Sequence, residues 1–434
     1  MTAVEIIRDR IASLRTELEM YPNLWEMFQQ CFLNTIETTV KQEEGDTFVI
    51  TGDIPAMWLR DSTAQVLHYL RFANQDVIAE MLEGLLARQV DCILRDPYAN
   101  AFNKEPSAYK PYDDTPRAGE WVWERKYEID SLCYPIWLAE KYFDKTGRTG
   151  FLNERFGSMM HRVVDVFRLE QNHAESEYRF VRKNCPPSDT LTNDGKGEPV
   201  AYTGMTWSGF RPSDDACKYG YLIPSNLFAV RVLKSVVKLA KQMGDDLLAK
   251  EAEALGDEIA VGIQKYGVVE HSQLGKIYAY EADGLGNVNL LDDANVPSLL
   301  ALPYLEVCSK EDEIYRNTRA FVLSRENPFF YQGSLAEGVG SPHTPPGFIW
   351  PIALCVQAMT SKDVDEIAHL LNMLMTTHAG TGFMHESFHP DKPEYYTRSW
   401  FAWANSMFGE MLYRLYEEGT LQQVIKRAIE LKTL

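Results

Sequence analysis

The feature that most constrains the fold is a helical spacing of apolar residues that recurs along almost the whole chain. In residues 4–19, Ile6, Ile7, Ile11 and Leu14 fall on one face of a helix. The same spacing continues through residues 24–40, 63–97, 127–145, 153–171, 225–242, 246–266, 292–303, 311–323, 348–359, 363–378, 398–416 and 420–432. The pattern predicts an all-α protein.

Strand-like segments are short and scattered. Residues 47–50 and 178–181 are predicted as small hairpins within loops, and a break near Asn74-Gln75 divides residues 63–97 into two helices. The chain lacks the alternation of helix and strand that builds parallel sheets, and it lacks a glycine-rich nucleotide motif. Long loops rich in Gly, Pro, Trp, Arg and Asp separate the helices, and loops of this kind usually carry function.

The helices occur in pairs, which favours six helical hairpins arranged in a ring as one domain over residues 1–434. Residues 99–120 form the best candidate for a domain break, but a break there would divide the helical array. An open helical solenoid is the alternative architecture. The absence of a fixed repeat period argues against it.

Net charge narrows the classes of partner. The 434-residue chain has a formal charge of −19, and an acidic surface repels both nucleic acid and anionic lipid. We therefore expect neither a nucleic-acid nor a membrane partner. A neutral or cationic small molecule fits better, and the sequence leaves the oligomeric state open.

Seven cysteines are scattered along the chain without a CxxC pair, which is neither a disulfide framework nor a zinc pattern. Free thiols in a reducing compartment are the simplest interpretation. The N-terminal segment is charged and amphipathic, unlike a secretory signal, and no long apolar run predicts a membrane span. Together these observations predict a cytoplasmic protein.

Two loops combine acids with Trp or Arg near the start of predicted helices. Residues 51–63 hold Trp58, Arg60 and Asp61, which could clamp the vicinal hydroxyl groups of a sugar. An Arg–Asp pair that merely caps the next helix is the plainer alternative. In residues 119–132, Glu128 and Asp130 open a helix, where acids are common for reasons of the helix dipole alone.

The loop at residues 205–226 holds Trp207, Arg211 and the adjacent acids Asp214 and Asp215. Two adjacent carboxylates repel, so in an enclosed pocket one of them would have a raised pKa and stay protonated. A proton donor to a glycosidic oxygen needs that property. Alternatively, both acids are solvated, or one pairs with a nearby cation.

The remaining polar loops lie in the last third of the chain. Residues 331–351 contain His343, although a lone histidine is more often structural. Residues 382–410 place Glu386 and Glu394 among Arg398 and several aromatic residues. Histidines in this loop raise the question of a metal site, but their spacing matches no standard ligand pattern, so we expect none.

Three of these segments resemble the signature segments of glycoside hydrolase family 125: TGDIPAMWLRDS, SGFRPSDDACKYGYLIPSN and HESFHPDKPEYYTRSWFAWANSMFGE. The resemblance extends from about residue 20 to the end of the chain. It implies an (α/α)6 barrel, inverting chemistry, no metal or other cofactor, and exo-cleavage of α-1,6-linked mannose from a mannose-containing oligosaccharide.

The resemblance also implies roles for particular residues. It favours Asp214 as the general acid, with Asp215 in reserve, and Glu386 as the general base, with Glu394 in reserve. The acid would protonate the glycosidic oxygen while the base activates a water molecule on the opposite face of the ring. The expected sugar-binding residues are Trp58, Arg60, Asp61, Asp130, Trp207, His343 and Arg398.

Three other functions remain possible at this stage. The barrel could act on another α-glycoside, in which case only the pocket would differ. It could be a glycan-binding protein without catalysis, which would leave a mannobiose unchanged. A metal-dependent mannosidase would lose activity in a chelator, whereas the resemblance predicts no effect.

Overall fold

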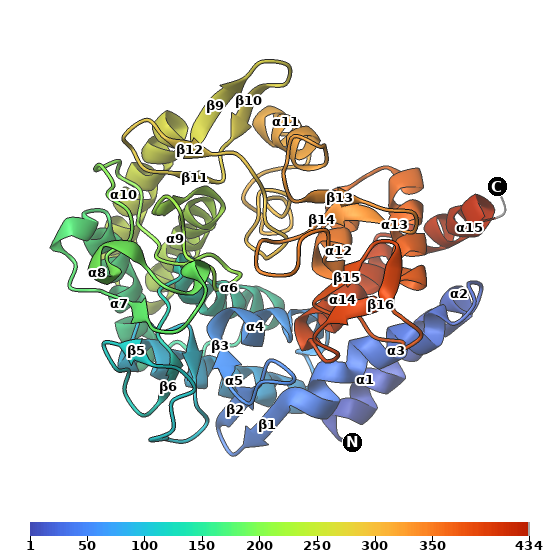
Figure 1. Ribbon diagram of the computed structural model, residues 1–434. Helices are drawn as coiled ribbons and strands as arrows, with labels where there is room; N and C mark the ends of the chain where they lie inside the picture. Colours follow the sequence, from blue (N-terminus) through green and yellow to red (C-terminus); the bar gives the residue numbers. More distant parts are fainter. Residues whose placement is uncertain (433–434) are drawn as a thin grey trace.

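The computed structural model describes residues 1–432, most of which form helices or the loops between them (Figure 1). The α-helices are α1 (Ala3–Ile11), α2 (Arg15–Leu18), α3 (Leu24–Asn34), α4 (Leu59–Ala64), α5 (Asp76–Arg95), α6 (Ile129–Thr146), α7 (Glu154–Glu170), α8 (Thr192–Gly195), α9 (Ile223–Met243), α10 (Asp246–Gly262), α11 (Glu313–Val322), α12 (Pro351–Thr360), α13 (Val364–Thr376), α14 (Ala402–Glu417) and α15 (Leu421–Lys432). Shorter helical turns are η1 (Ala12–Leu14), η2 (Thr35–Thr39), η3 (Leu67–Phe72), η4 (His173–Glu175), η5 (Pro187–Asp189) and η6 (Ile263–Gly267).

The strands are short and lie within the loops. Two-stranded antiparallel pairs are β1 (Val40–Glu43) with β2 (Asp46–Val49), β5 (Asp114–Thr115) with β7 (Val181–Arg182), β9 (Val268–His271) with β10 (Gly275–Tyr278), β13 (Phe330–Gln332) with β14 (Glu337–Val339), and β15 (Ser387–His389) with β16 (Lys392–Thr397). Three-stranded sheets join β3 (Met57–Trp58), β4 (Ala101–Phe102) and β6 (Val122–Glu124), and β8 (Tyr221–Leu222), β11 (Glu281–Ala282) and β12 (Val288–Asn289).

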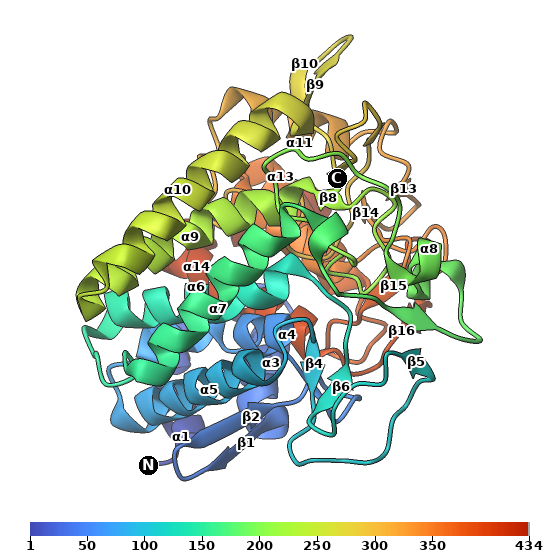
Figure 2. The ribbon, with the colours of Figure 1, turned by 90° about the vertical axis from the view of Figure 1, so that its left-hand side faces the viewer.

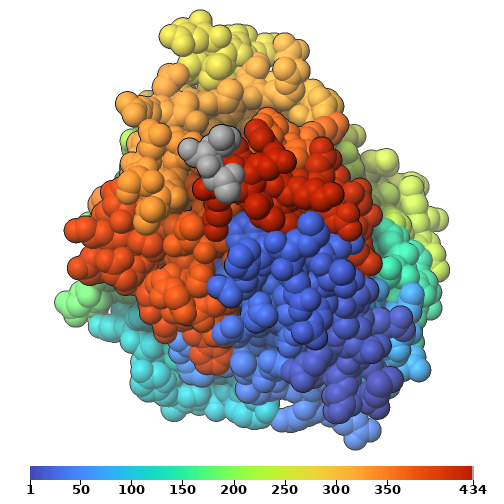
Figure 3. All heavy atoms as spheres, turned by 90° about the vertical axis from the view of Figure 1, so that its right-hand side faces the viewer, coloured from blue at the N-terminus to red at the C-terminus, as the bar shows by residue number. Residues whose placement is uncertain are grey.

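The chain runs around a centre, so that its last helices return to its first (Figure 1). Helix α4 contacts α6, α6 contacts α9, and α12 contacts α14, while α14 packs on both α3 and α4. Outside them, α5 contacts α7 and α7 contacts α10, and Figure 2 shows these three helices on one flank. Figure 3 shows the red C-terminal segments beside the blue N-terminal ones. The arrangement therefore brings loops from distant parts of the chain together.

One contiguous hydrophobic cluster extends from Ile6 to Ala428 and takes in residues of nearly every helix. Such a cluster forms because the amphipathic helices turn their apolar stripes toward one another. Within residues 1–432, we find no helix with the length and apolar character that crossing a membrane requires.

Most of the expected helices form, but residues 292–303 do not, and that prediction is wrong. There the Asp292 carboxylate accepts the backbone N–H groups of Leu299 and Leu300, at 2.8 and 2.9 Å, and closes an irregular turn. Pro297 also lacks the amide hydrogen that a helix needs. Local side-chain bonding of this kind competes with helix formation.

The other local predictions had mixed outcomes. The break near residues 74–75 is confirmed, since η3 ends at Phe72 and α5 begins at Asp76. Residues 47–50 contribute to the β1–β2 hairpin as expected. The hairpin expected at residues 178–181 is wrong, because Val181 pairs instead with the distant Thr115.

The close approach of α3 and α14 predicts that alanine destabilises the protein at Gly409, within this contact, but not at Gly256, outside it. A Cβ added at Gly409 would lie 2.9 Å from the Phe32 ring and 3.0 Å from its Cα, so Gly409→Ala must push the two helices apart. Overpacking costs about 1–3 kcal/mol, more than the ~1 kcal/mol that alanine gains in a helix. We expect a lower free energy of unfolding in urea.

Gly256 in α10 is the matched control, since its added Cβ would make only ordinary contacts, 3.6 Å from Leu233. Gly256→Ala should leave the free energy of unfolding unchanged or raise it by up to about 1 kcal/mol. Equal behaviour of the two variants would contradict the close approach of α3 and α14.

Candidate active site

A small pocket lies where the N-terminal ends of α4, α12 and α14 meet the long loops. Its empty space, including the part open to solvent, is about 380 Å³. Its lining comes from distant segments: Thr51, Ile54, Trp58, Arg60, Asp61, Pro212, Ser213, Asp214, Asn295, His343, Trp350, Glu386, Arg398, Phe401 and Trp403. The pocket therefore combines carboxylates, guanidinium groups and indole rings.

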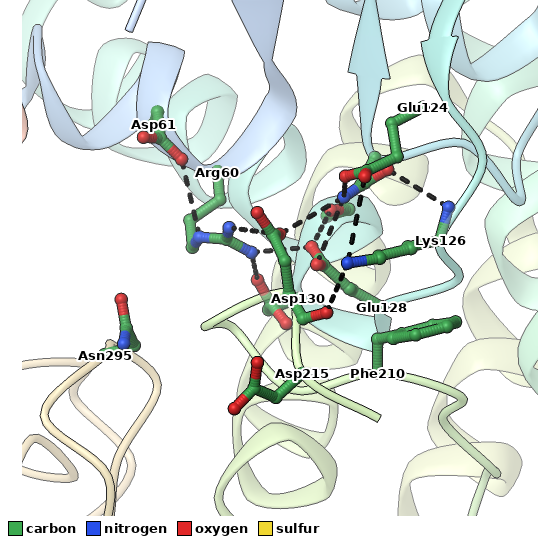
Figure 4. Close-up of polar contacts among 12 residues, drawn as sticks. Arg60, Asp61, Glu124, Lys126, Glu128, Asp130, Phe210, Asp215 and Asn295 are labelled. Atoms are coloured by element: carbon green, nitrogen blue, oxygen red, sulfur yellow. Dashed lines mark hydrogen bonds and ion pairs between the residues drawn. The ribbon is translucent and has the colours of Figure 1, made fainter. Parts of the chain in front are cut away.

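The guanidinium of Arg60 is the centre of the site's polar network (Figure 4). Its Nη1 donates to Glu128 at 2.6 Å and to Asp130 at 3.0 Å, and its Nη2 donates to Asp214 at 3.3 Å. Asp61 lies 3.5 Å from Nε. Glu128 and Asp130 are fully buried at the start of α6, so they hold Arg60 from behind rather than line the pocket.

The loop before β8 presents its two acids in different directions. Asp214 has a backbone φ of +66° within a tight turn in which its N–H bonds to Arg211 O, at 2.9 Å. Its carboxylate lines the pocket, with 23% of the side chain exposed. The Asp215 side chain is 6% exposed and accepts a bond from His343 Nδ1, at 3.0 Å. Asp214 is thus the accessible acid and Asp215 the support of His343.

Glu386 lines the pocket from the loop that leads into β15, and Arg398 lies beside it. The Arg398 Nη1 is 3.6 Å from Glu386 Oε1, and its Nε donates to Asp53 Oδ1 at 3.0 Å. The guanidinium also lies 4.6 Å from the centre of the Phe401 ring. These contacts fix Arg398 between two carboxylates and keep a cation next to Glu386.

The environment shifts the pKa values of several of these groups. Burial raises the pKa of Asp61 to about 6, although Arg60 opposes the shift. Burial alone would raise the pKa of Asp214 too, but Arg60, Glu128, Lys126 and His343 together hold it below its usual value. The sequence predicted a raised pKa for one of the adjacent acids Asp214 and Asp215, but the pKa of Asp214 is lowered instead. The strongly raised carboxyl is Glu128, because burial outweighs Arg60 there.

Of the expected site residues, four lie outside the pocket, among them Asp215, which bonds to His343. Trp207 is fully buried and stacks on His173 with ring centres 3.5 Å apart, so it supports the loop. Asp130 contacts Arg60 from behind, and Glu394 is exposed on β16. The structure brings together Trp58, Arg60, Asp61, Asp214, His343, Glu386 and Arg398.

Several lining residues were missed by sequence reasoning. Asn295 and Trp350 had no chemical motif around them, since a lone amide or indole is common in any loop. Sequence reasoning also missed Asn100, which lies outside the pocket lining but donates to Asp214 from within residues 99–120, the candidate domain break. For Glu128, the position at the start of a helix was visible, but its contact with Arg60 depends on the fold.

Polar atoms without a protein partner occur at this site. Trp58 Nε1, Trp403 Nε1 and Ser213 Oγ are buried and make no hydrogen bond within the described residues, and all three residues line the pocket. Buried polar groups are usually satisfied, so donors of this kind suit a ligand rich in hydroxyl groups.

A larger hollow lies at the surface between the β1–β2 hairpin, α5 and α7. Its charged groups include Asp91, which pairs with Arg155, and Glu83, which accepts from Tyr142. The loops that carry the acids of the small pocket do not reach it. Size alone therefore does not identify the active site.

Comparison with known proteins identifies the class of enzyme. The chain is a glycoside hydrolase. It belongs to family 125, the metal-independent α-mannosidases, whose family model matches residues 21–413. Among residues 1–432, no cluster of three or more His, Cys, Asp or Glu side chains is arranged to hold a metal ion.

Individual relatives agree with this family. A Streptococcus pneumoniae metal-independent α-mannosidase, in a non-productive complex with α-1,6-mannobiose, superposes with a TM-score of 0.93 and 47% identity over 95% of this chain and 98% of that one. The meiotically up-regulated gene 157 protein of Schizosaccharomyces pombe is 36% identical over 95% of this chain and 86% of its own length.

A bacterial glucoamylase complexed with acarbose has a TM-score of 0.61 and 14% identity, covering 98% of this chain and 61% of that one. That likeness concerns the fold alone. The helical architecture is thus shared with a glycosidase that differs almost completely in sequence.

The His343–Asp215 pair predicts a pH-dependent stability. Burial opposes the charge of His343, but Asp215, Glu386 and Asp214 raise its pKa from 6.5 to about 9. Its contribution is therefore complete below pH 6.5 and is lost as the pH rises through about 9. The difference in Tm between wild type and His343→Gln should be larger at pH 6 than at pH 10; a difference independent of pH would contradict a charged His343.

Proposed function

We propose that the enzyme is an inverting exo-mannosidase that removes terminal α-1,6-linked mannose. The observation that carries the proposal is a small pocket lined by Asp214 and Glu386 together, with aromatic residues around them. The close relative's complex with α-1,6-mannobiose supports the linkage. A small pocket suits a single terminal sugar and hence exo action.

Asp214 is our general acid and Glu386 our general base. In favour of Asp214 over Asp215, only Asp214 lines the pocket, while Asp215 bonds to His343. In favour of Glu386 over Glu394, Glu386 lines the same pocket and Glu394 is exposed on β16. The two chosen acids come from loops far apart in the sequence, as a two-carboxylate site requires.

The reaction then follows from the two roles. Asp214 protonates the glycosidic oxygen as the bond to the anomeric carbon breaks, and Glu386 takes a proton from the water that attacks the opposite face. The oxocarbenium-like state yields β-mannose. An inverting site needs roughly 6.5–9.5 Å between its carboxyl groups to admit that water.

The remaining lining groups hold the terminal sugar. Asp61 and Arg60 offer an acceptor and a donor for adjacent hydroxyl groups, and the indoles of Trp58 and Trp403 offer flat faces and N–H donors. His343 and Arg398 place positive charge next to the two catalytic acids. Asp130 lies outside the pocket and positions Arg60, and Trp207 supports the loop that carries Asp214.

We further propose that residues 1–434 form one (α/α)6 barrel that works in the cytoplasm. The single hydrophobic cluster and the packing of α14 on α3 and α4 support one closed domain. All seven cysteines are free thiols, which suits a reducing compartment. The natural substrate is a short mannose-containing oligosaccharide, such as an N-glycan fragment.

The proposal predicts the anomer that is released first. Proton NMR of α-1,6-mannobiose during hydrolysis should show β-mannose before mutarotation. Asp214→Asn and Glu386→Gln should each lower kcat by at least about 100-fold, because each removes one half of the acid–base pair. Glu394→Gln is the matched control and should keep kcat within a few-fold of wild type.

Three outcomes would count against the proposal. Release of α-mannose first would mean a retaining route. Full activity of Glu386→Gln, with loss in Glu394→Gln, would move the base. An intact mannobiose after prolonged incubation with wild type would remove the linkage assignment.

A further inference from the structure

Three carboxyl groups converge on the side-chain amide of Asn100. The Asn100 Nδ2 lies 3.0 Å from Glu124 Oε2, 3.2 Å from Glu128 Oε1 and 3.3 Å from Asp214 Oδ1. An amide nitrogen carries only two hydrogens, so three carboxyl groups are crowded around two donors. Glu128 and Asp214 also hydrogen-bond to each other, and a hydrogen bond between two carboxyl groups requires a proton on one of them.

The cations nearby indicate which acids share that proton. Glu124 has its own partner, because Arg182 Nη2 donates to it at 2.8 Å. Glu128 and Asp214 instead share one guanidinium, that of Arg60, which also contacts Asp61 and Asp130. The single positive charge of Arg60 does not neutralise all of these carboxylates, so Glu128 and Asp214 repel each other. A proton shared between them removes this repulsion.

We propose that the carboxyl groups of Glu128 and Asp214 share one proton, and that Glu128 stores it until Asp214 delivers it to the leaving oxygen. This inference rests on the proposed function, in which Asp214 is the general acid. Glu128 does not line the pocket, so it acts through Asp214 as a positioning residue. A general acid does not by itself need a second carboxyl group to store its proton, so this role of Glu128 goes beyond the proposed function.

The charges around Glu128 agree with the direction of storage. Glu128 contacts Arg60, Asn100 and Ser131. The charges of Asp130 and Asp214 also act on it, and its own charge acts on the Cys217 thiol. Burial raises the pKa of Glu128 well above its usual value. Arg60 and Lys126 overcome burial at Asp214 and lower its pKa. The resting proton therefore belongs on Glu128.

The proton balance of one turnover is simple. The pair begins with one proton, which passes from Glu128 to Asp214 and then to the glycosidic oxygen as its bond to the anomeric carbon breaks. Both carboxyl groups are then ionised beside Arg60. Water forms the new bond to carbon and gives one proton to Glu386. Solvent returns a proton to the pair through Asp214, the more exposed member, and Glu386 releases its own.

The test compares wild type with Glu128→Gln on two leaving groups. The amide keeps the shape and donates to Asp214 permanently, which holds Asp214 ionised. On α-1,6-mannobiose, which needs a proton, we expect kcat at pH 7 to fall by at least about 100-fold. On α-mannosyl fluoride, which needs none, kcat should stay within about 5-fold, since acid catalysis contributes little there.

The pH profile gives a second readout on the same variant. Activity on mannobiose falls at high pH as the pair loses its proton, and removal of one carboxylate lowers that pKa. The alkaline limb should therefore move to lower pH by about one unit or more. Glu124→Gln is the control: it also contacts Asn100, but its limb should stay in place.

Equal loss on both substrates, with an unmoved limb, would reduce Glu128 to a structural role and overturn the proposal. If Glu128→Gln does not fold, neutron diffraction of the wild type decides: a deuteron between Glu128 and Asp214 supports storage, and its absence contradicts it. Failure of the proposed function is distinguishable, because wild type itself would then leave mannobiose intact.

Discussion

The guanidinium of Arg60 is the interaction on which the rest of the site depends. It gathers acids from the α4 turn, from the start of α6 and from the loop before β8. The farthest of them, Asp214, lies 154 positions from Arg60 in the sequence. Each of these charges is costly to bury alone, since desolvation of an ion costs several kcal/mol. Arg60 makes the cluster tolerable, and in doing so it fixes where Asp214 stands.

The site is therefore a problem in distributing protons as much as in placing atoms. Asp61, Glu128, Asp130 and Asp214 surround one arginine, and buried Lys126 adds a second cation behind them. An inverting hydrolase needs one acid that carries a proton and one base that does not. Here the two proposed residues differ in surroundings: Asp214 joins the Arg60 cluster, while Glu386 lies beside Arg398, which also bonds to Asp53.

Much of the fold could be predicted from the sequence because the apolar residues of an amphipathic helix recur at a helical spacing. Helices such as α5 and α10 bury a regular apolar stripe, and the spacing of that stripe is visible in the amino-acid sequence. The same spacing wrongly predicted a helix at residues 292–303, where hydrogen bonds to the Asp292 side chain replace those of a helix. Apolar spacing does not record that competition.

The candidate site was predictable only in part. Arg60 and Asp61 could be identified as candidates because they lie next to each other, close to Trp58, in a single loop. Trp207 looked equally promising, but its ring stacks on His173 and is buried. Asn100 and Glu128 act through contacts with residues that are distant in the sequence. A single sequence does not reveal which distant loops lie together in the fold.

The central claim is that the small pocket binds a terminal mannose between Asp214 and Glu386. The most direct test is a crystal structure of Asp214→Asn soaked with α-1,6-mannobiose. The account predicts the non-reducing mannose in the pocket, its glycosidic oxygen facing residue 214 and a water held by Glu386 on the opposite face of the ring. A mannobiose bound with its reducing end innermost, or with both acids on the same face of the sugar, would contradict it.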